Sequence, residues 1–282
     1  MFLRVHLPRA SRHRLPGLQV GPESRPLLRV RSDQKIAGPM VSVRLSERDI
    51  RVVSKCGVSK WLTTGQLARL YFPQVTPDAV RKSLRRLVEA GYLVVHREHQ
   101  MAEALHGLGP KGKVLLEAKG IAAEVTRKPP RQIEHLVGIN DVRVAVEVKP
   151  QQVAYFFACW ELPALGWVHP VIPDAVLGLR VPERRTFLVE YDRGTETLPT
   201  LVRKVRGYDG GLSGISFRAL LLVTDTEARL ETLARHVRNE GFLRRILGCV
   251  RAELSSEGID APLFQDLRRI DPGKSTLSES AE

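Results

Sequence analysis

Cysteine is scarce in this sequence and long apolar runs are absent, and both features exclude classes of protein. The three cysteines, Cys56, Cys159 and Cys249, lie far apart and form no CxxC pair. We therefore expect neither a disulfide framework nor a structural zinc site, and this cysteine usage fits the reducing cytoplasm. No apolar run approaches the roughly 20 residues that a membrane-spanning helix needs, so no membrane partner is expected.

Acidic residues are scarce in the first part of the chain. The sequence carries 44 Lys and Arg against 31 Asp and Glu, a formal net charge of +13. Residues 1–130 hold 24 of the basic and 10 of the acidic residues, whereas residues 131–272 hold 19 of each. A basic part beside a neutral part predicts that the first part binds a polyanion such as nucleic acid. The alternative is that the charge serves solubility alone.

The rest of the composition is that of a globular protein. With 43% apolar residues in 282, the chain has enough material for real cores, and its length suggests two domains. Residues 1–40 have scattered prolines and basic residues without apolar periodicity, so we expect a disordered basic tail, or a true start at Met40. This segment lacks the apolar core of a secretory signal.

Residues 41–128 predict a DNA-binding domain. Capping residues open three helices, at Ser46, Thr63 and Thr76, and Gly91 ends the third. Residues 93–96 and 104–108 then flank a polar tip and predict a β-hairpin, and a further helix follows over residues 110–119. Three helices followed by a hairpin are typical of a winged helix-turn-helix domain.

The third helix of this domain is the predicted recognition helix. Its apolar stripe, Val80, Leu84, Leu87 and Val88, leaves a basic face opposite. That face is formed by Arg81, Lys82, Arg85 and Arg86. Like charges so close together are tolerable when DNA phosphates neutralise them, so double-stranded DNA is the predicted partner. Further DNA contacts are expected from Arg97, Lys111 and Lys113. The alternative is an ordinary solvated helix face.

The second part of the chain, residues 131–250, predicts a different domain. The expected elements are a helix over 131–149, strands over 153–160, 171–179 and 186–191, a helix from Thr195 to about Tyr208, a strand over 217–224 and a helix over 226–239. An αβββαβ order is the core order of the restriction-endonuclease-like fold. The predicted fold class is therefore α+β or α/β with two domains. A partly disordered C-terminal extension is expected over residues 251–282.

Carboxylates fall on two of the predicted strands. If residues 171–179 and 186–191 pair, Asp174 lies near Glu190, and Glu190 shares a face with Asp192 because strand side chains alternate. Convergent carboxylates resist ionising together unless a cation lies between them, and Mg²⁺ is the natural occupant. We therefore predict a magnesium site, with Glu134 as a further candidate ligand and Lys204 as a candidate phosphate contact.

The helix over residues 131–149 carries two unusual features. Gly138 and Ala145 lie on one face with Glu134 and Asp141, and such small residues would let this face approach the sheet closely. Asn140 falls on the apolar stripe, a position where an amide needs a hydrogen-bonding partner.

Three runs of the sequence carry a resemblance to a known family. They are EHLVGINDVR over 134–143, PDAV over 173–176 and FLVEYDRGTE over 187–196, followed by Lys204 and Tyr208. Together they resemble the replication-relaxation family of bacterial plasmid and mobile-element proteins. The resemblance implies a DNA-binding module fused to a domain similar to the PD-(D/E)xK nucleases. Asp192 stands where that motif has its lysine, so Lys204 is the candidate substitute.

These features predict a cytoplasmic DNA-binding protein that acts in plasmid or mobile-element replication control. One alternative is an active Mg²⁺-dependent endonuclease that its winged helix targets, with Asp174, Glu190, Asp192 and Lys204 as catalytic residues. Another is a transcriptional repressor whose second domain only dimerises. Convergent carboxylates argue against the repressor, because a dimer surface gains nothing from them. The sequence leaves open the DNA target and whether the protein is a homodimer.

Overall fold

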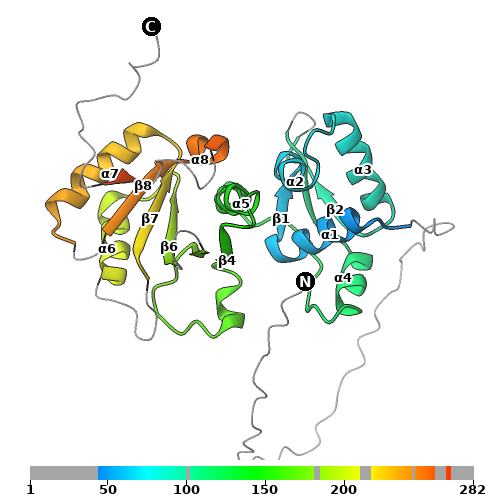
Figure 1. The fold of residues 1–282 in the computed structure, drawn as a ribbon, viewed down its shortest axis with the longest axis horizontal. Coiled ribbons are helices and arrows are strands. Elements are labelled where there is room, and N and C mark those ends of the chain that lie inside the picture. The colour runs from blue at the N-terminus through cyan, green and yellow to red at the C-terminus, as the bar shows by residue number, and fades with distance from the viewer. Residues whose placement is uncertain are drawn as a thin grey trace, which may run out of the picture. The chain divides into compact units, whose positions relative to one another are not determined.

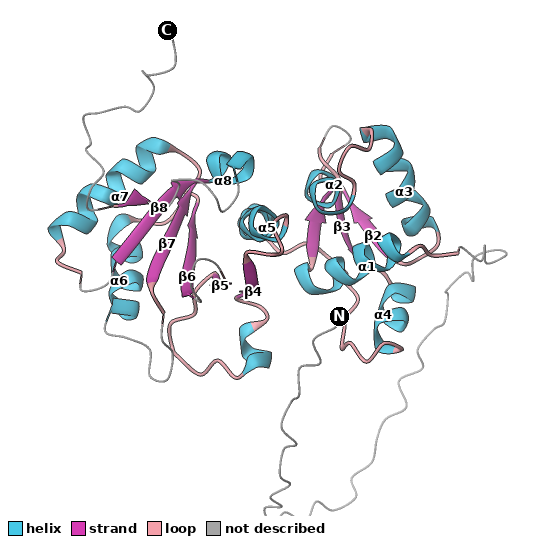
Figure 2. Cartoon of the chain, in the orientation of Figure 1, coloured by secondary structure: helices cyan, strands magenta, loops and turns pink. Residues whose placement is uncertain are grey.

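The computed structural model describes residues 44–99, 102–180, 185–209, 217–242, 245–257 and 265–267. These residues form eight α-helices and two β-sheets, a mixed α and β fold, and they belong to one compact unit, Val41–Glu282 (Figures 1 and 2). The predicted tail and most of the C-terminal extension lie outside the described residues. Of the helices described, none is both long and apolar enough to cross a membrane.

The N-terminal half, residues 44–130, contains the first sheet. Its elements are α1 (Glu47–Ser59), β1 (Trp61–Thr63), α2 (Thr64–Tyr71), α3 (Pro77–Glu89), β2 (Leu93–His96), β3 (Leu105–Leu108) and α4 (Pro110–Glu117). The predicted helix starts are confirmed, because Ser46 and Thr63 each form a capping box with the residue three positions later. Gly91 has a φ of 80°, the left-handed conformation that ends α3 as predicted.

The first sheet has one strand more than the predicted hairpin. Its order is β1-β3-β2 with both pairings antiparallel, so β3 is central. Strand β1 was not predicted, because a strand of three residues offers no alternation to detect. Val52, Leu67 and Leu84 of the helices pack with Leu62 and Leu108 of the sheet in one buried apolar core.

The C-terminal half, residues 131–267, contains the second sheet. Its elements are α5 (Ile133–Glu147), β4 (Val153–Ala158), a 3₁₀ turn η1 (Leu162–Leu165), β5 (Ala175–Leu179), β6 (Arg185–Asp192), α6 (Leu198–Asp209), β7 (Ala219–Thr224), α7 (Glu227–Asn239), β8 (Arg245–Val250), α8 (Arg251–Glu257) and β9 (Gln265–Asp266). The predicted order of helices and strands over 131–239 is confirmed. The sequence analysis did not assign β8, α8 and β9.

The second sheet has the order β4-β5-β6-β7-β8-β9. Strands β4, β5 and β6 form an antiparallel meander, and β6, β7 and β8 run parallel. Apolar residues of α5 and α8 pack on one face, and those of α6 and α7 pack on the other. Every residue of β7 is buried, which explains its continuous apolar sequence.

Helix α6 begins later than the sequence predicted. The predicted cap, Thr195, lies before the helix, whose first residue is Leu198. Gly194 adopts a φ of 78° and donates its backbone N–H to Asp192, so the chain turns here rather than continuing into a helix. The backbone N–H of Leu201 donates to the carbonyl of Thr197 at 3.1 Å, which places the helix start after Thr197.

Helix α5 joins the two halves. The amide nitrogen of Asn140, which is fully buried, donates to the carbonyls of Ser59 and Trp61 at 3.0 and 2.8 Å. The amide nitrogen of Gln66 donates to the carbonyl of Val137 at 2.9 Å. The expected partner of Asn140 is therefore the backbone beside β1, and α5 belongs to both halves.

Gly138 explains how closely α5 approaches the second sheet. A Cβ atom at this position would lie 1.9 Å from the Tyr191 ring on β6, far inside any tolerable contact. The predicted role of a small residue here is thus confirmed. The close packing brings the first turn of α5 next to the ends of β5 and β6.

Candidate functional site

The basic face of α3 is exposed. Arg81, Lys82 and Arg85 all lie on the solvent side of the helix, opposite the buried Val80, Leu84 and Leu87. Arg81 contacts Asp78, and Arg85 lies 3.6 Å from Glu89. Such exposed ion pairs within one helix are weak. Both guanidinium groups can therefore exchange these partners for DNA phosphates or bases.

Arg86 differs from its three neighbours on α3. Its guanidinium donates to Asp49 at 2.6 Å, and the Asp49 side chain is almost fully buried. Asp49 is also the third residue of α1 and completes its capping box with Ser46. Arg86 thus braces α3 against α1, and the DNA contact expected from the sequence stays a prediction for this half-buried side chain.

A groove of about 380 Å³ runs between α3 and the hairpin strands β2 and β3. Arg81, Lys82 and Arg85 line one side, and the exposed Arg97 lines the other. Lys113 contacts Glu117 on α4, and neither Lys111 nor Lys113 is among the groove residues. The groove therefore gathers four of the predicted DNA-binding cations on one surface.

The second sheet brings together Asp174, Glu190 and Lys204. Ala175 of β5 pairs with Val189 of β6, so Asp174 and Glu190 are neighbours across these strands. The ammonium of Lys204 on α6 contacts the Glu190 carboxylate and lies 3.9 Å from Asp174 Oδ1. A lysine from the helix after β6 thus lies between two carboxylates.

Glu190 is deeply buried in this site. Its side chain is 2% exposed, and its two oxygens accept hydrogen bonds from Lys204 and from the Tyr208 hydroxyl, the latter at 2.5 Å. Burial, together with the negative charge of Asp174, raises the pKa of Glu190 to about 8. This carboxyl therefore exchanges its proton close to neutral pH.

Asp174 keeps its charge in the same site. Burial opposes ionisation, but the hydrogen bond to His135 and the charge of Lys204 outweigh it, so the pKa of Asp174 lies below its ordinary value. His135 Nε2 lies 3.1 Å from Asp174 Oδ1, and the backbone N–H of Tyr191 donates to Oδ2 at 2.8 Å. Despite its own burial, the pKa of Lys204 is raised by the two carboxylates.

The carboxylates of Asp192 and Glu134 have partners outside the cluster of Asp174, Glu190 and Lys204. Asp192 shares the sheet face of Glu190, but its oxygens accept hydrogen bonds from Arg229 on α7 at 2.6 Å and from the backbone of Gly194 at 2.9 Å. Glu134 is exposed and lies 3.5 Å from Arg193. The expected convergence of three carboxylates thus differs from the structure, which brings two carboxylates and one lysine together.

A family model described as replication-relaxation matches residues 57–214, more than half of the chain. The chain belongs to the replication-relaxation family. The match runs from the end of α1 past α6 and includes Asp174, Glu190 and Lys204. No curated protein and no solved structure is significantly similar to this member of the family.

The donor set of this replication-relaxation protein suits a hard divalent cation. Carboxylate oxygens are the ligands that Mg²⁺ prefers, and it commonly binds one or two carboxylates while substrate phosphates and water complete its shell. Asp174, which directly precedes β5, and Glu190 on β6 supply two such groups; β5 begins later than the predicted strand 171–179. In the described part of the chain no three His, Cys, Asp or Glu side chains are arranged to hold a metal.

Two site residues of this family member, both among the residues that carry the family resemblance, were given no role in the carboxylate site from the sequence. Tyr208 lies four positions after Lys204 on α6, so the helical repeat alone places both on one face. His135 lies three positions before Gly138 and shares the face of α5 that approaches β6. Its ring also lies against Tyr191, with centroids 5.5 Å apart. Periodicity around the known carboxylates was the available signal for both.

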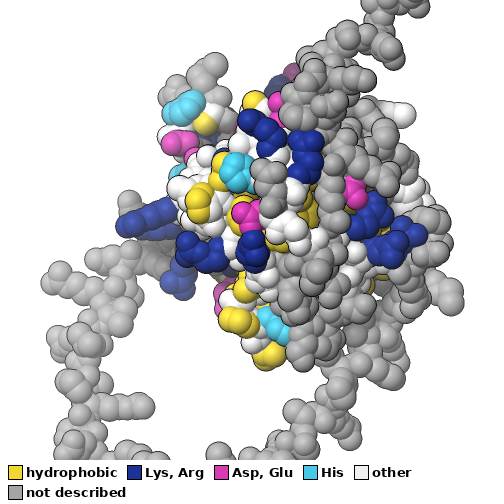
Figure 3. All heavy atoms as spheres, turned by 90° about the vertical axis from the view of Figure 1, so that its left-hand side faces the viewer, with side chains coloured by type: hydrophobic (Ala, Val, Ile, Leu, Met, Phe, Trp, Pro, Cys, Tyr) yellow, Lys and Arg dark blue, Asp and Glu magenta, His cyan; other side chains and the backbone are white. Residues whose placement is uncertain are grey.

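The surface of the C-terminal half is more basic than its composition suggests. Among the described residues, three of its acids, Asp174, Glu190 and Asp192, are buried but only one of its bases, Arg143, so burial removes more negative than positive charge from the surface. Figure 3, which views the side with α6 and α7, shows several groups of Lys and Arg on the described surface. Exposed arginines on these helices are Arg203, Arg206, Arg235 and Arg238. A polyanion can therefore be attracted by both halves of this replication-relaxation protein.

Proposed function

We propose that the protein binds double-stranded DNA through α3 and the β2–β3 hairpin, in the replication of a plasmid or another mobile element. The observation that carries this proposal is the exposed basic groove formed by Arg81, Lys82, Arg85 and Arg97. The element order of the N-terminal half, three helices followed by a hairpin, is that of a winged helix, in which such a helix enters the major groove. Membership of the replication-relaxation family supports a role in the replication of such an element.

Replacing Arg81 and Arg85 together with Ala is the test of this proposal. We expect duplex binding to weaken by about 2–5 kcal/mol, because one guanidinium would contact a base and the other a phosphate. Fluorescence anisotropy with a labelled duplex measures the affinity. Both side chains are exposed, so folding is expected to survive the change.

The matched control is the double replacement of Arg235 and Arg238 with Ala. These arginines are also exposed and the variant loses the same charge, but they lie on α7. The control should lose less than about a third of that binding energy. Equal losses in the two variants would show that only total charge matters, and would remove α3 from the recognition role.

A second candidate function is a Mg²⁺-dependent DNA endonuclease. The observation that favours it is the contact between Lys204 and Glu190 beside Asp174, because Lys204 is the candidate substitute for the motif lysine that Asp192 replaces in the sequence. When bound, a divalent cation would polarise a phosphodiester. Asp174 and Glu190 would hold it, and Lys204 would contact the phosphate. Asp174 has a lowered pKa and Glu190 a pKa of about 8. Two neighbouring carboxyls whose pKa values are pushed apart in this way are typical of acid–base sites.

A further inference from the structure

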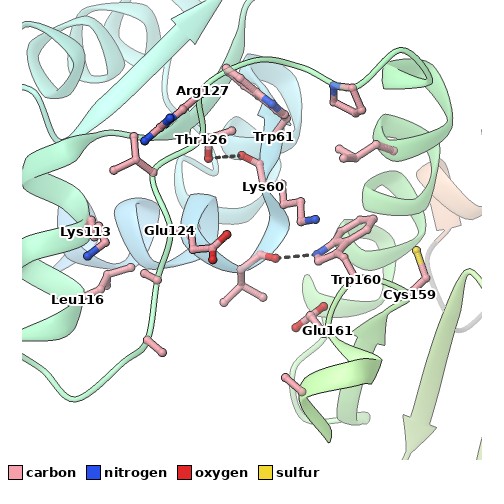
Figure 4. Close-up of a pocket in the computed structure, with 18 of the residues that line it drawn as sticks. Lys60, Trp61, Lys113, Leu116, Glu124, Thr126, Arg127, Cys159, Trp160 and Glu161 are labelled. Atoms are coloured by element: carbon pink, nitrogen blue, oxygen red, sulfur yellow. Dashed lines mark hydrogen bonds between the residues drawn. The ribbon is translucent and has the colours of Figure 1, made fainter. Parts of the chain in front are cut away.

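A large cavity lies beside the carboxylate site. It has a volume of about 1260 Å³ and is lined by the end of α1, the segment 121–128, the first turns of α5 and the region after β4 (Figure 4). His135, which contacts Asp174, also lines this cavity. A ligand in the cavity would therefore reach His135, whose imidazole contacts Asp174 of the candidate site.

Trp160 presents an indole ring to this cavity. Its Nε1 donates to the carbonyl of Val58 at 2.9 Å, which fixes the ring, and the side chain remains partly exposed. The ammonium of Lys60 lies 5.7 Å from the ring centroid, and Figure 4 shows the two side chains pointing toward one another. An anchored aromatic ring beside an exposed cation is a typical platform for a nucleic acid base.

The backbone at Lys60 is strained. Its φ of 63° and ψ of −67° belong to a region that residues other than Gly rarely adopt. Strained residues of this kind cluster at ligand sites, because selection for stability alone would replace them. Glycine at this position would relieve the strain but would remove the ammonium from the cavity.

The charges that line the cavity favour an anionic ligand. Two of the acids that line the cavity form ion pairs within the protein, Glu117 with Lys113 and Glu161 with the buried Arg143, so their charges are neutralised. The remaining charged residues that line the cavity, His135 aside, are Lys60, Arg127, Lys128 and Glu124. Three cations against one acid, around an aromatic ring, resemble the stacking surfaces and basic channels that bind single strands.

We propose that the cavity binds a short stretch of unpaired nucleotides. One base stacks on Trp160, and the adjoining phosphates contact Lys60, Arg127 and Lys128. An exposed cation–π contact is weaker than base stacking, so a base displaces the Lys60 ammonium from the ring, and the ammonium then pairs with a phosphate. The inference rests on the proposed function in taking nucleic acid as the ligand, and it adds a single-stranded substrate beside the candidate site.

The test uses the full chain with a labelled oligothymidine of about ten nucleotides and a duplex of equal length, since single-strand sites span a few to about sixteen nucleotides. Trp160→Leu should weaken oligothymidine binding by about 5–100-fold, and Trp160→Phe, which keeps a ring, by no more than about threefold. Lys60→Gly should weaken it by about 3–10-fold while the melting temperature stays equal or rises. The matched control is Trp167→Leu, outside the cavity lining.

The outcomes separate this inference from the proposed function. Duplex affinity should stay unchanged in all these variants, because α3 and the hairpin are intact. Wild-type protein that binds the duplex but not the oligothymidine would overturn the inference alone. Equal losses in Trp160→Leu and Trp167→Leu would also overturn it. If Trp160→Leu does not fold, an unchanged oligothymidine affinity in Lys60→Gly would decide against it.

Discussion

Asp174→Asn is expected to abolish the stabilisation of the protein by Mn²⁺ or Mg²⁺. In the wild type, cation at about ten times its dissociation constant should raise the melting temperature by about 3–6 °C through mass action. The variant removes the ionised ligand but keeps an oxygen for the Tyr191 N–H, so the fold should be preserved. Any Mg²⁺-dependent nicking of supercoiled plasmid should fall by about a thousandfold, since metal stabilisation of the transition state amounts to several kcal/mol.

Asp192→Asn is the matched control for this experiment. Its carboxylate binds Arg229 and the Gly194 backbone, so the metal response should persist even if the melting temperature falls. Loss of the response in both variants would show that all three carboxylates bind the cation, as the sequence suggested. Calorimetry that detects no Mn²⁺ binding by the wild type would contradict both the metal site and the endonuclease candidate.

Glu190→Gln is expected to stabilise the protein, and more so at higher pH. Because the pKa of Glu190 is raised from 4.5 in the unfolded chain to about 8, the folded state holds a proton that the unfolded state releases across this window. The stability that this proton contributes is fully present below the unfolded pKa of 4.5 and is lost as the pH rises through the folded pKa of about 8. Gln mimics the protonated acid, so its advantage should reach about 2–4 kcal/mol near pH 9 and vanish below about pH 4.

Urea unfolding of both proteins across this pH range measures the difference. Glu134→Gln, which changes an exposed carboxylate on α5, should leave the free energy of unfolding nearly unchanged at every pH. A constant difference between Glu190→Gln and the wild type would show that Glu190 is ionised throughout, held by Lys204. A protein that becomes more stable when a functional charge is removed shows the usual trade-off, in which a site needed for activity lowers the stability of the fold.

The features predicted correctly from the sequence depend on signals that are local in the chain. Thr76, Pro77 and Gly91 fix α3 within one segment, and the apolar stripe between them fixes its buried face. The proximity of Asp174 and Glu190 follows from the pairing of two consecutive strands, which a short connection determines.

The features that were missed depend on distant partners. Arg86 forms an ion pair with Asp49, and Asp192 forms one with Arg229; in each pair the partners are 37 residues apart in the chain. Neither pairing has a periodic signal, because each depends on how separate elements pack. The same limit applies to α5, whose contacts with Ser59 and Trp61 tie together halves that the composition presents as independent modules.

The salt dependence of duplex DNA affinity tests the central proposal most directly. If about six cations of the α3 groove and its surroundings meet phosphates, the logarithm of the association constant should fall with log salt at a slope of about −5. In the Arg81→Ala, Arg85→Ala variant the slope should become shallower by about one to two. A wild-type slope near zero, or one that the variant leaves unchanged, would contradict DNA binding through α3.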